Sequence, residues 1–382
     1  ADACSAKQLS SWLEPESGCY IHVPFCRERC GYCHFRSYTD LRGVPGWLNT
    51  VISGLQKKVI PGSAYPEVHA RNVSSLYLGG GTPSLLEPRD LHAVLAAAWG
   101  AFPHLQEITV ECHPADLRPD LVELLTDTGV TRLSVGIQSF AEELRRSVRR
   151  CSPDIDPGPA LVAASRFPGT LSIDLITGMQ GQTEAHVTTD VRLAMEAGAA
   201  HVSVYDLSPS PHQEIQSDGP ERRAALLEAA GAAADSYGLH RYEVSNYAAP
   251  GRECLHNSNY WLLGTWLAFG QGAEGRVRQG NGALSYRVGA DGKLRKETES
   301  PDACLRDYVI SSLRTRRGVD PARASRIAGK DVAGLLLEWW QKDVPQSAKL
   351  DGEHGNLCLN PDGWMLENRL LSAFLDRAAG RW

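Results

Sequence analysis

Apolar runs typical of strands alternate with longer amphipathic segments over the first half of the chain. The strand-like runs lie at 19–24, 74–78, 107–111, 132–135, 171–176 and 201–205. Segments with helical spacing separate several of these runs, and three are followed directly by glycine: 88–99, 119–128 and 183–197. This order predicts a parallel sheet, closed or partly closed as in a (β/α) barrel. In such a fold the functional site lies at the carboxyl ends of the strands.

The second half of the chain is less regular. The strand-and-helix order weakens after Tyr242, in a glycine- and asparagine-rich stretch that runs to about Lys296. Residues 301–342 then have helical spacing, and 357–364 is typical of a hairpin that leads into a last helix at 365–379. The three regions that we expect are an N-terminal extension at 1–18, a barrel domain at 19–300 and a small, mainly helical C-terminal domain at 301–382.

The charge balance argues against partners that carry many negative charges. Lys and Arg number 39 against 45 Asp and Glu, which gives a formal net charge of −6. Such a chain offers no broad electrostatic attraction to nucleic acid or to an anionic membrane. No apolar run approaches the about 20 residues that a membrane helix needs, and residues 1–4 do not open a secretory signal. We expect a cytoplasmic protein that binds neither nucleic acid nor membrane.

Three of the ten cysteines fall within one short loop after the first predicted strand. Cys26, Cys30 and Cys33 are spaced C-x-x-x-C-x-x-C, whereas the other seven are scattered and are expected to be reduced thiols. Such a loop can supply three thiolates to a [4Fe–4S] cluster and leaves the fourth iron open to a substrate or cofactor. The alternatives are three buried thiols without a metal, or a zinc site with His34 or His22 as the fourth ligand.

Other distinctive residues also lie where predicted strands end. The run GGGTP at 79–83 closes the second strand, Glu111 closes the third, and Gln138 follows the fourth. Glycines let a backbone approach a ligand with no Cβ in between. Asp174 places a charge inside an apolar strand, where an unpaired carboxylate would be costly. Because the carboxyl ends of parallel strands meet at one edge, these residues predict a single site.

Two motifs resemble the radical S-adenosylmethionine (SAM) superfamily. Its signature is the three-cysteine spacing with an aromatic residue before the last cysteine, here Tyr32. The run YIHVPFC at 20–26 is similar to the branch that contains oxygen-independent coproporphyrinogen III dehydrogenase and the haem chaperone HemW. The resemblance covers roughly residues 19–280. It implies a partial (β/α)6 barrel, a [4Fe–4S] cluster, and a SAM whose amino and carboxylate groups bind the open iron.

The resemblance also implies a reaction and a set of cofactor-binding residues. An electron donor such as flavodoxin or ferredoxin would drive cleavage of SAM to a 5′-deoxyadenosyl radical. The glycine loop would meet the methionyl amine of SAM, Glu111 could accept from its ribose hydroxyls, and Arg150 could hold a carboxylate. The residues expected to bind SAM are Tyr20, Phe35, Gly79, Gly80, Gly81, Thr82, Glu111, Gln138, Arg150, Asp174, Gln271 and Ala273.

Four departures from the usual HemW pattern favour a different acceptor. The chain has His34 after its third cysteine where HemW usually has Asp, and Glu274 where HemW usually has His. His113 lies in a changed strand end at 111–114, and 149–152 lacks the usual Gly and His. We therefore predict a class C methyltransferase that passes the methyl group of a second SAM to an sp² carbon of a small-molecule or peptide-derived heteroaromatic substrate. His34, His113 and Glu274 are then candidate general bases.

The alternative function within the branch is a HemW-like haem chaperone. His256 is the candidate haem ligand, because a neutral imidazole binds iron, and Tyr260 and Trp261 could cover a porphyrin face. The same histidine could instead only form hydrogen bonds. A coproporphyrinogen III dehydrogenase-like oxidoreductase is a further alternative. In each case these three residues are the predicted substrate-binding group.

Overall fold

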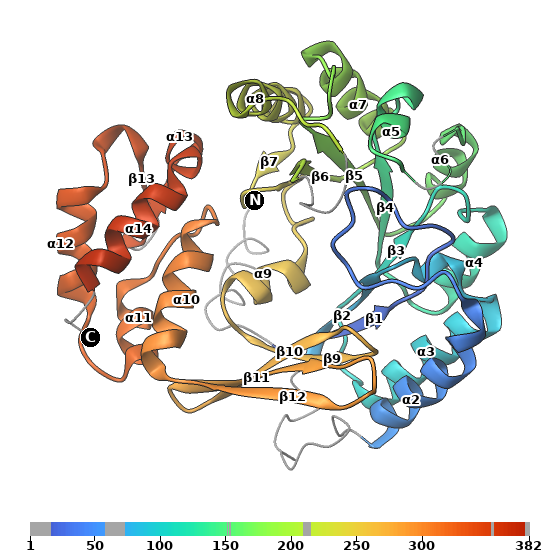
Figure 1. Ribbon diagram of the computed structural model, residues 1–382, viewed down its shortest axis with the longest axis horizontal. Coiled ribbons are helices and arrows are strands. Elements are labelled where there is room, and N and C mark those ends of the chain that lie inside the picture. Colours follow the sequence, from blue (N-terminus) through green and yellow to red (C-terminus); the bar gives the residue numbers. More distant parts are fainter. Residues whose placement is uncertain are drawn as a thin grey trace, which may run out of the picture.

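The computed structural model describes residues 17–57, 73–150, 152, 154–208, 215–352 and 355–378. Its main feature is a 12-stranded sheet in the order β12-β11-β10-β9-β1-β2-β3-β4-β5-β6-β8-β7. The strands follow an arc, and helices cover its outer side (Figure 1). The order ends at β12 on one side and at β7 on the other, so the described strands form a barrel that is only partly closed.

Six neighbouring parallel strands confirm the predicted partial (β/α)6 barrel. They are β1 (Ser17–Val23), β2 (Val73–Gly80), β3 (Glu107–Cys112), β4 (Arg132–Gln138), β5 (Thr170–Thr177) and β6 (His201–Asp206). The helices of this part are α2 (Val44–Lys57), α3 (Pro88–Ala101), α4 (Pro119–Asp127), α5 (Glu142–Ser147), α6 (Gly158–Ala164), α7 (Glu184–Glu196) and α8 (Pro220–Ser236). The predicted helices at 88–99, 119–128 and 183–197 correspond to α3, α4 and α7.

The alternation of side chains along each strand separates the apolar core from the barrel interior. On β2, Leu76 and Leu78 are fully buried and share a core with Leu91 of α3. Ser75 and Tyr77 point to the opposite face, because successive side chains of a strand alternate. The barrel interior therefore carries polar groups, and the hydrophobic core lies between the strands and the outer helices.

The stretch around and after Tyr242, where the predicted strand-and-helix order weakens, forms strands and a helix. They are β7 (His240–Arg241), β8 (Asn246–Ala248), α9 (Leu255–Trp261), β9 (Thr265–Phe269), β10 (Glu274–Gln279), β11 (Gly282–Val288) and β12 (Leu294–Glu299). β9 pairs with β1 in parallel, and β10 to β12 extend the sheet antiparallel. Gly280 and Gly292 have φ values of 58° and 73° between these strands. The glycines therefore serve tight turns, which concealed the strands in a glycine-rich composition.

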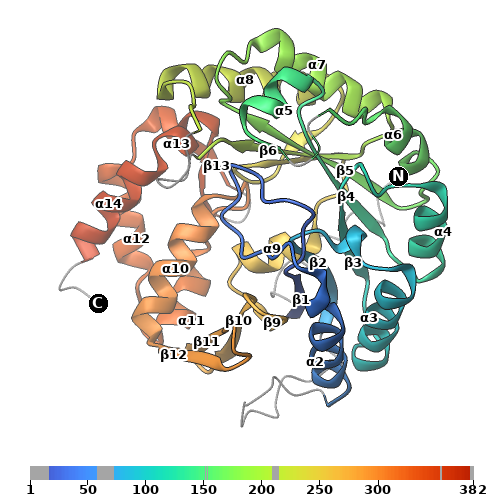
Figure 2. The ribbon, with the colours of Figure 1, turned by 45° about the vertical axis from the view of Figure 1, so that its right-hand side comes forward.

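The C-terminal part is mainly helical and lies to one side of the barrel (Figure 2). Its helices are α10 (Pro301–Leu313), α11 (Pro321–Ala328), α12 (Ala333–Asp343), α13 (Pro361–Met365) and α14 (Glu367–Ala378). A hairpin forms between β13 (Lys349–Asp351) and β14 (Leu357–Leu359). The prediction of a hairpin over 357–364 was therefore misplaced. Asn360 instead caps α13 by accepting a hydrogen bond from Gly363 N at 2.8 Å, and this ends the strand.

A second hydrophobic core holds the C-terminal helices together. It includes Leu305 and Trp339, both fully buried, and also Leu263 and Ala283 from the β-strand extension. The predicted domain boundary near residue 300 stays a prediction, because this core draws on both sides of it. Short 3-10 turns complete the structure at η1 (Leu41–Gly43), η3 (Pro83–Leu85) and η4 (Gln346–Ala348). None of the helices in the described ranges has the length and apolar character needed to cross a membrane.

Candidate functional site

A cavity opens at the carboxyl ends of the parallel strands, and we call it the mouth cavity. Its volume is about 410 Å³, and its walls come from the loop at 26–37 and the ends of β2 to β6. Thirteen of the predicted site residues line it: Cys26, Cys30, Cys33, His34, Phe35, Gly80, Gly81, Thr82, Glu111, His113, Gln138, Arg150 and Asp174. The structure therefore brings most of the predicted cofactor residues to one place.

The three predicted metal-binding cysteines line the mouth cavity together. Their loop is fixed to the barrel by a main-chain bond from Gly31 N to Arg149 O at 3.2 Å. Cys30 is 7% exposed, and Cys26 and Cys33 are half-buried. Burial raises the pKa of the Cys26 and Cys33 thiols. Metal binding at this loop would therefore release protons, since the thiolate is the ligand.

Two side chains donate hydrogen bonds to the cysteine sulfurs. Thr82 Oγ1 lies 3.6 Å from Cys26 Sγ, and Arg150 Nη1 lies 3.3 Å from Cys30 Sγ. Arg150 Nη2 also donates to Gly136 O at 2.7 Å, which fixes the guanidinium at the end of β4. A cation beside a thiol favours the thiolate, and the thiolate is the form that binds a metal. The surroundings of the loop thus fit a metal cluster held by three sulfurs.

The glycines at the end of β2 are required by close packing against other strands. A Cβ on Gly81 would lie 2.4 Å from Val23 O, and a Cβ on Gly80 would lie 2.1 Å from His22 Nδ1. Gly80 also has a φ of 100°, which residues with a side chain rarely adopt. Its N–H donates to Glu111 Oε2 at 3.0 Å. The sequence predicts that these glycines let a ligand approach the backbone. Packing within the protein is a second reason for glycine at Gly80 and Gly81.

Two carboxyl groups face the mouth cavity from β3 and β5. Glu111 accepts a hydrogen bond from Tyr77 O–H at 2.9 Å, and Asp174 accepts from Ser134 Oγ at 2.9 and 3.0 Å. Burial raises the pKa of Glu111 to about 7, and the nearby Asp174 charge adds to this rise. Burial also raises the pKa of Asp174, although hydrogen bonds from serines and the charge of Arg150 oppose it. Both groups can accept from hydroxyl or ammonium groups of a ligand.

Gln138 lines the cavity with an unusual backbone conformation. Its φ is 73°, and it follows a shift in register between Gly136 and Gln138 where β4 pairs with β5. A bulge of this kind re-aims a side chain at the end of a strand. Positive φ in a residue other than glycine is strained and tends to occur at functional sites. The sequence predicts the place of Gln138 but gives no signal for the bulge.

Two of the three predicted proton-accepting groups lie at the mouth cavity. His34 Nε2 donates to Ser208 O at 3.0 Å. His113 is 5% exposed, and its Nδ1 accepts from Ala115 N at 3.0 Å. Glu274 does not line the cavity; it is exposed on β10, where it forms an ion pair. The structure therefore removes the geometric basis for Glu274 as a base at this cavity.

By the family resemblance, a second SAM is expected near the glycine run around residue 270, and this run also lies outside the lining of the mouth cavity. Gln271 and Ala273 do not border it, and Ala273 is fully buried in the main core. The neighbouring Gly270 packs on the end of β1, where a Cβ would lie 2.2 Å from His22 O. The glycine run near 270 is thus explained by contact with the first strand. The expectation that it brings backbone close to a second ligand stays a prediction.

His22 and Tyr20 are engaged with each other at the end of β1. His22 Nε2 donates to Arg36 O at 2.8 Å, and its Nδ1 lies 3.0 Å from Tyr20 Oη. Both ring nitrogens of His22 therefore have protein partners, which counts against His22 as a zinc ligand. Tyr20 and Gly79 border this region but do not line the mouth cavity.

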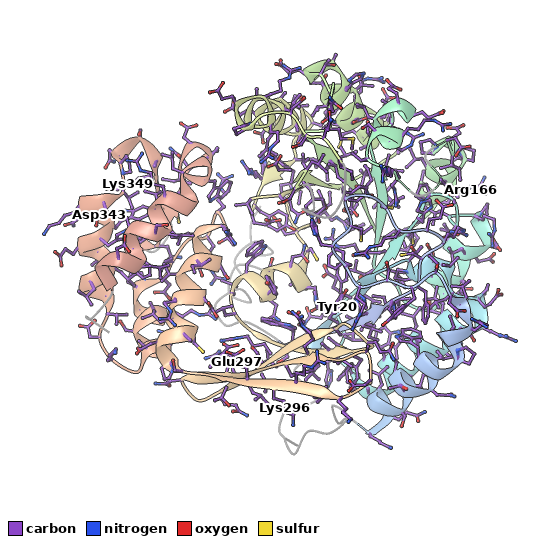
Figure 3. All side chains as sticks on the ribbon, in the orientation of Figure 1. Tyr20, Arg166, Lys296, Glu297, Asp343 and Lys349 are labelled. Carbon is purple, nitrogen blue, oxygen red and sulfur yellow. The ribbon has the colours of Figure 1, made fainter. Side chains whose placement is uncertain are left out.

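The predicted haem ligand lies at the opposite end of the barrel interior. α9 lies on the inner side of the arc of strands (Figures 1 and 2), and Tyr20 of β1 lies beside it (Figure 3). His256 Nδ1 is 3.2 Å from Ser75 Oγ, and the His256 ring centre is 5.2 Å from that of Tyr77. Burial lowers the pKa of His256 to about 4. The imidazole is therefore neutral at pH near 7, the form that binds iron.

Tyr260 and Trp261 form an aromatic group apart from the His256 ring. The Tyr260 ring lies 5.6 Å from Trp261 and 5.0 Å from Trp266, and Tyr260 is 49% exposed. In the part of the chain that the structure describes, neither ring contacts His256. The arrangement in which Tyr260 and Trp261 cover the face of a porphyrin bound to His256 is therefore not preformed.

Sequence reasoning missed the polar residues at the amino ends of the strands. Glu107, Arg132 and His201 begin β3, β4 and β6 and are 7%, 4% and 2% exposed. Together with Cys254 and His256 they make up what we call the barrel floor. The available signal was a charged or polar residue at the first position of each apolar strand, the same kind of signal that singled out Asp174.

Comparison with known proteins agrees with this geometry. Residues 20–194 match the model of the radical SAM superfamily. The haem chaperone HemW of Bacillus subtilis is 26% identical over 93% of this chain and 98% of its own length, and HemW of Mycobacterium tuberculosis is 31% identical over 84% and 87%. The solved structure of coproporphyrinogen III oxidase (HemN) from Escherichia coli, a radical SAM enzyme, covers 97% of this chain and 93% of its own with a TM-score of 0.74 at 19% identity. The chain therefore belongs to the radical SAM superfamily, in the branch that includes the haem chaperone HemW.

Proposed function

We propose that this chain is a HemW-like haem-binding protein that holds a [4Fe–4S] cluster and one SAM in the mouth cavity. The grouping of Cys26, Cys30 and Cys33 with Glu111 and Arg150 around a single cavity carries the proposal. The likeness to haem chaperones over most of the chain supports haem as the cargo. Delivery of haem to other proteins would then be the purpose of the molecule.

The residues of the mouth cavity suit these groups. The three thiols can each bind one iron of the cluster, which leaves the fourth iron for SAM. Arg150 presents a fixed guanidinium to a carboxylate, and Glu111 and Asp174 present acceptors to hydroxyl and amino groups. When bound, the cluster supplies an electron that cleaves SAM, and this electron comes from a donor such as flavodoxin or ferredoxin. The walls of the cavity hold the bound molecules and exclude bulk water.

His256 is the proposed haem ligand at the barrel floor. Its low pKa keeps the imidazole neutral, and the Ser75 hydroxyl at Nδ1 leaves Nε2 to bind iron. Part of the surface of the residue as a whole is exposed to solvent. Tyr260, half-exposed on the same helix, offers an aromatic surface to a flat ligand. A movement of this aromatic group toward His256 would complete the site.

Anaerobic reconstitution and haem titration test the two halves of this proposal separately. Reconstituted protein should hold about four irons per chain. Haem addition should produce a Soret band that weakens in His256→Ala and is unchanged in His104→Ala, which removes an exposed histidine. A wild-type Soret band in His256→Ala would eliminate His256 as the ligand. Failure of the unaltered protein to bind haem would overturn the chaperone function.

Class C methyl transfer is a second candidate with one supporting observation. His34 and His113 line the mouth cavity and could accept a proton from a product carbon there. The residues expected to serve the second SAM do not line it, so the geometry favours the chaperone. Release of S-adenosylhomocysteine together with 5′-deoxyadenosine on incubation with heteroaromatic acceptors would reverse this order. A chaperone is not expected to release S-adenosylhomocysteine.

A further inference from the structure

Helix α9, which carries His256, takes its N-terminal cap from a distant strand. Its own N-cap residue, Cys254, makes no side-chain hydrogen bond to the first turn. The carboxylate of Glu107 at the start of β3 takes this place, because Leu255 N donates to Oε2 and His256 N donates to Oε1, each at 3.0 Å. A carboxylate in this position satisfies amides that have no partner within the helix and complements the helix dipole.

The Glu107 carboxylate is itself held in one place. Arg132 Nε lies 3.3 Å from Oε2, and the two side chains are 4% and 9% exposed. Cys254 Sγ lies 3.3 Å from Oε1, and Arg132 also donates to Arg252 O. The same buried ion pair therefore holds the segment just before α9 as well as its first turn. A buried and paired carboxylate has little freedom to move, since any shift would leave a charge without its partner.

We propose that Glu107 is a positioning residue that fixes α9, and through it His256, at the barrel floor. The atom that it anchors is the main-chain nitrogen of His256 itself, so a displaced carboxylate would displace the imidazole directly. Ser75 Oγ, 3.2 Å from Nδ1, then sets the rotation of the ring. Groups that orient a metal-binding histidine in this way tune its affinity without touching the metal. The inference deepens the proposed function and depends on it for the identity of the ligand.

Hydrogen exchange in haem-free protein tests the positioning role without any ligand. The amides of residues 255–261 should exchange slowly in the unaltered chain, faster in Glu107→Gln and fastest in Glu107→Ala, which leaves no acceptor at all. Glu299→Gln is the control, because Glu299 is a partly buried carboxylate, 14% exposed, that pairs with the buried Arg276 and has no described contact with α9. It should leave the exchange of α9 unchanged. Equal exchange of α9 in all four proteins would overturn the inference.

Haem titration of the same variants tests the consequence for binding. Haem affinity should fall about tenfold in Glu107→Gln, the usual effect of removing a group that orients a metal ligand. It should fall in Glu107→Ala to the level of His256→Ala. The double variant should be no weaker than His256→Ala alone, because Glu107 acts only through His256. Where His256→Ala does lose haem, additive losses, or faster exchange of α9 with unchanged affinity in the Glu107 variants, would overturn the inference.

Two outcomes separate this inference from the proposed function. If His256→Ala binds haem normally while α9 loosens in Glu107→Ala, the haem ligand is misassigned and the positioning of His256 by Glu107 stands. If His256→Ala loses haem while both Glu107 variants keep normal exchange and affinity, the haem site stands and the positioning role is wrong. Glu107→Gln keeps the shape of the side chain, so it serves where Glu107→Ala fails to fold.

Discussion

The two ends of the barrel interior use the same residue type in opposite ways. Glu107 and Glu111 lie four residues apart on β3 and both face inward. Glu107, at the floor, meets Arg132 and three donors from the segment that begins α9. Glu111, at the mouth cavity, accepts hydrogen bonds from Tyr77 and from Gly80 N and borders open space.

This difference shows how one strand can serve both structure and function. At the floor, the protein compensates its own buried charge, so the polar groups fix α9 in place. At the mouth cavity, burial raises the pKa of Glu111 to about 7, the charge of Asp174 adds to this rise, and none of the described residues forms an ion pair with Glu111. A bound ligand with amino or hydroxyl groups would donate hydrogen bonds to the Glu111 carboxylate.

Loss of one of the three predicted cluster thiols should have the largest effect on activity. This effect should be limited to the chemistry of the mouth cavity and leave haem binding intact. Replacing Cys30 with Ala removes one of three thiolates, so iron content and formation of 5′-deoxyadenosine should both fall to background. The Soret band of bound haem should persist, because His256 lies at the other end of the barrel. Cys358→Ala, which removes a buried thiol of the C-terminal part, should keep its iron. Loss of haem binding in Cys30→Ala would show that the two ends do not act separately.

Removal of Arg132 should give the largest loss of stability, because it unpairs a buried charge at the floor. Arg132→Ala leaves the Glu107 carboxylate without its cation, which should lower the free energy of unfolding by about 3–5 kcal/mol. Urea denaturation followed by circular dichroism measures this. Arg146→Ala breaks an exposed pair with Glu142 and should cost less than about 1 kcal/mol. An equal loss of unfolding free energy in the two variants would contradict the role of the buried Glu107–Arg132 ion pair in stabilising the floor.

Glu111 and His256 predict opposite changes of stability with pH. The pKa of Glu111 rises from 4.5 to about 7 on folding, so the folded state binds more protons in that range and stability falls as pH rises. The pKa of His256 falls from 6.5 to about 4, so the unfolded state binds more protons in that range and stability rises with pH. Denaturation of Glu111→Gln and His256→Gln across both ranges should show the first slope removed in one variant and the second in the other. Parallel pH profiles for both variants would contradict the assigned shifts.

The sequence is a good guide to the mouth and a poor one to the floor. The cysteine spacing, the glycine run and Glu111 each follow a predicted strand, and parallel topology then brings the strand ends together. The floor depends on contacts between residues far apart in the chain, such as Glu107 with Leu255 and His256. The polar residue at the start of each strand is visible in the sequence, but its distant partner is not. A glutamate in this position is also common on protein surfaces, so the local pattern does not predict the contact.

The β-strand extension shows a second reason for incomplete prediction. Its strands β10 and β11, of six and seven residues, are as long as barrel strands, but the glycines between them resemble those of a loop when composition alone is considered. The sequence predicts Glu274 at the site because its neighbours resemble family motifs. The turn at Gly270 instead sends β10 away along the edge of the sheet, and Glu274 is left exposed. Likeness of motif therefore located the cysteines correctly but not the side chains beyond the barrel strands.

The smallest expected effect is on the free energy of unfolding when Gln138 at the mouth cavity is replaced by Gly. This change should be zero or a slight gain, whereas Arg132→Ala at the floor lowers the free energy of unfolding. Gln138 has a φ of 73°, a strain that costs of order 1 kcal/mol in a residue with a side chain. Gln138→Gly relieves it but gives up about 0.5–1 kcal/mol of chain entropy, so stability should stay level or rise slightly. Gln138→Ala keeps the strain and loses the same amide.

Comparison of these two Gln138 variants separates strain from function. Both should bind SAM more weakly, as measured by equilibrium dialysis against reconstituted protein, because the cavity loses a donor and acceptor. Only the glycine variant should unfold at a denaturant concentration equal to or above that of the unaltered chain. If the alanine variant is as stable as the glycine variant, the bulge at the end of β4 stores no strain. The mouth would then differ from the floor in charge compensation alone, and not in backbone strain held for a ligand.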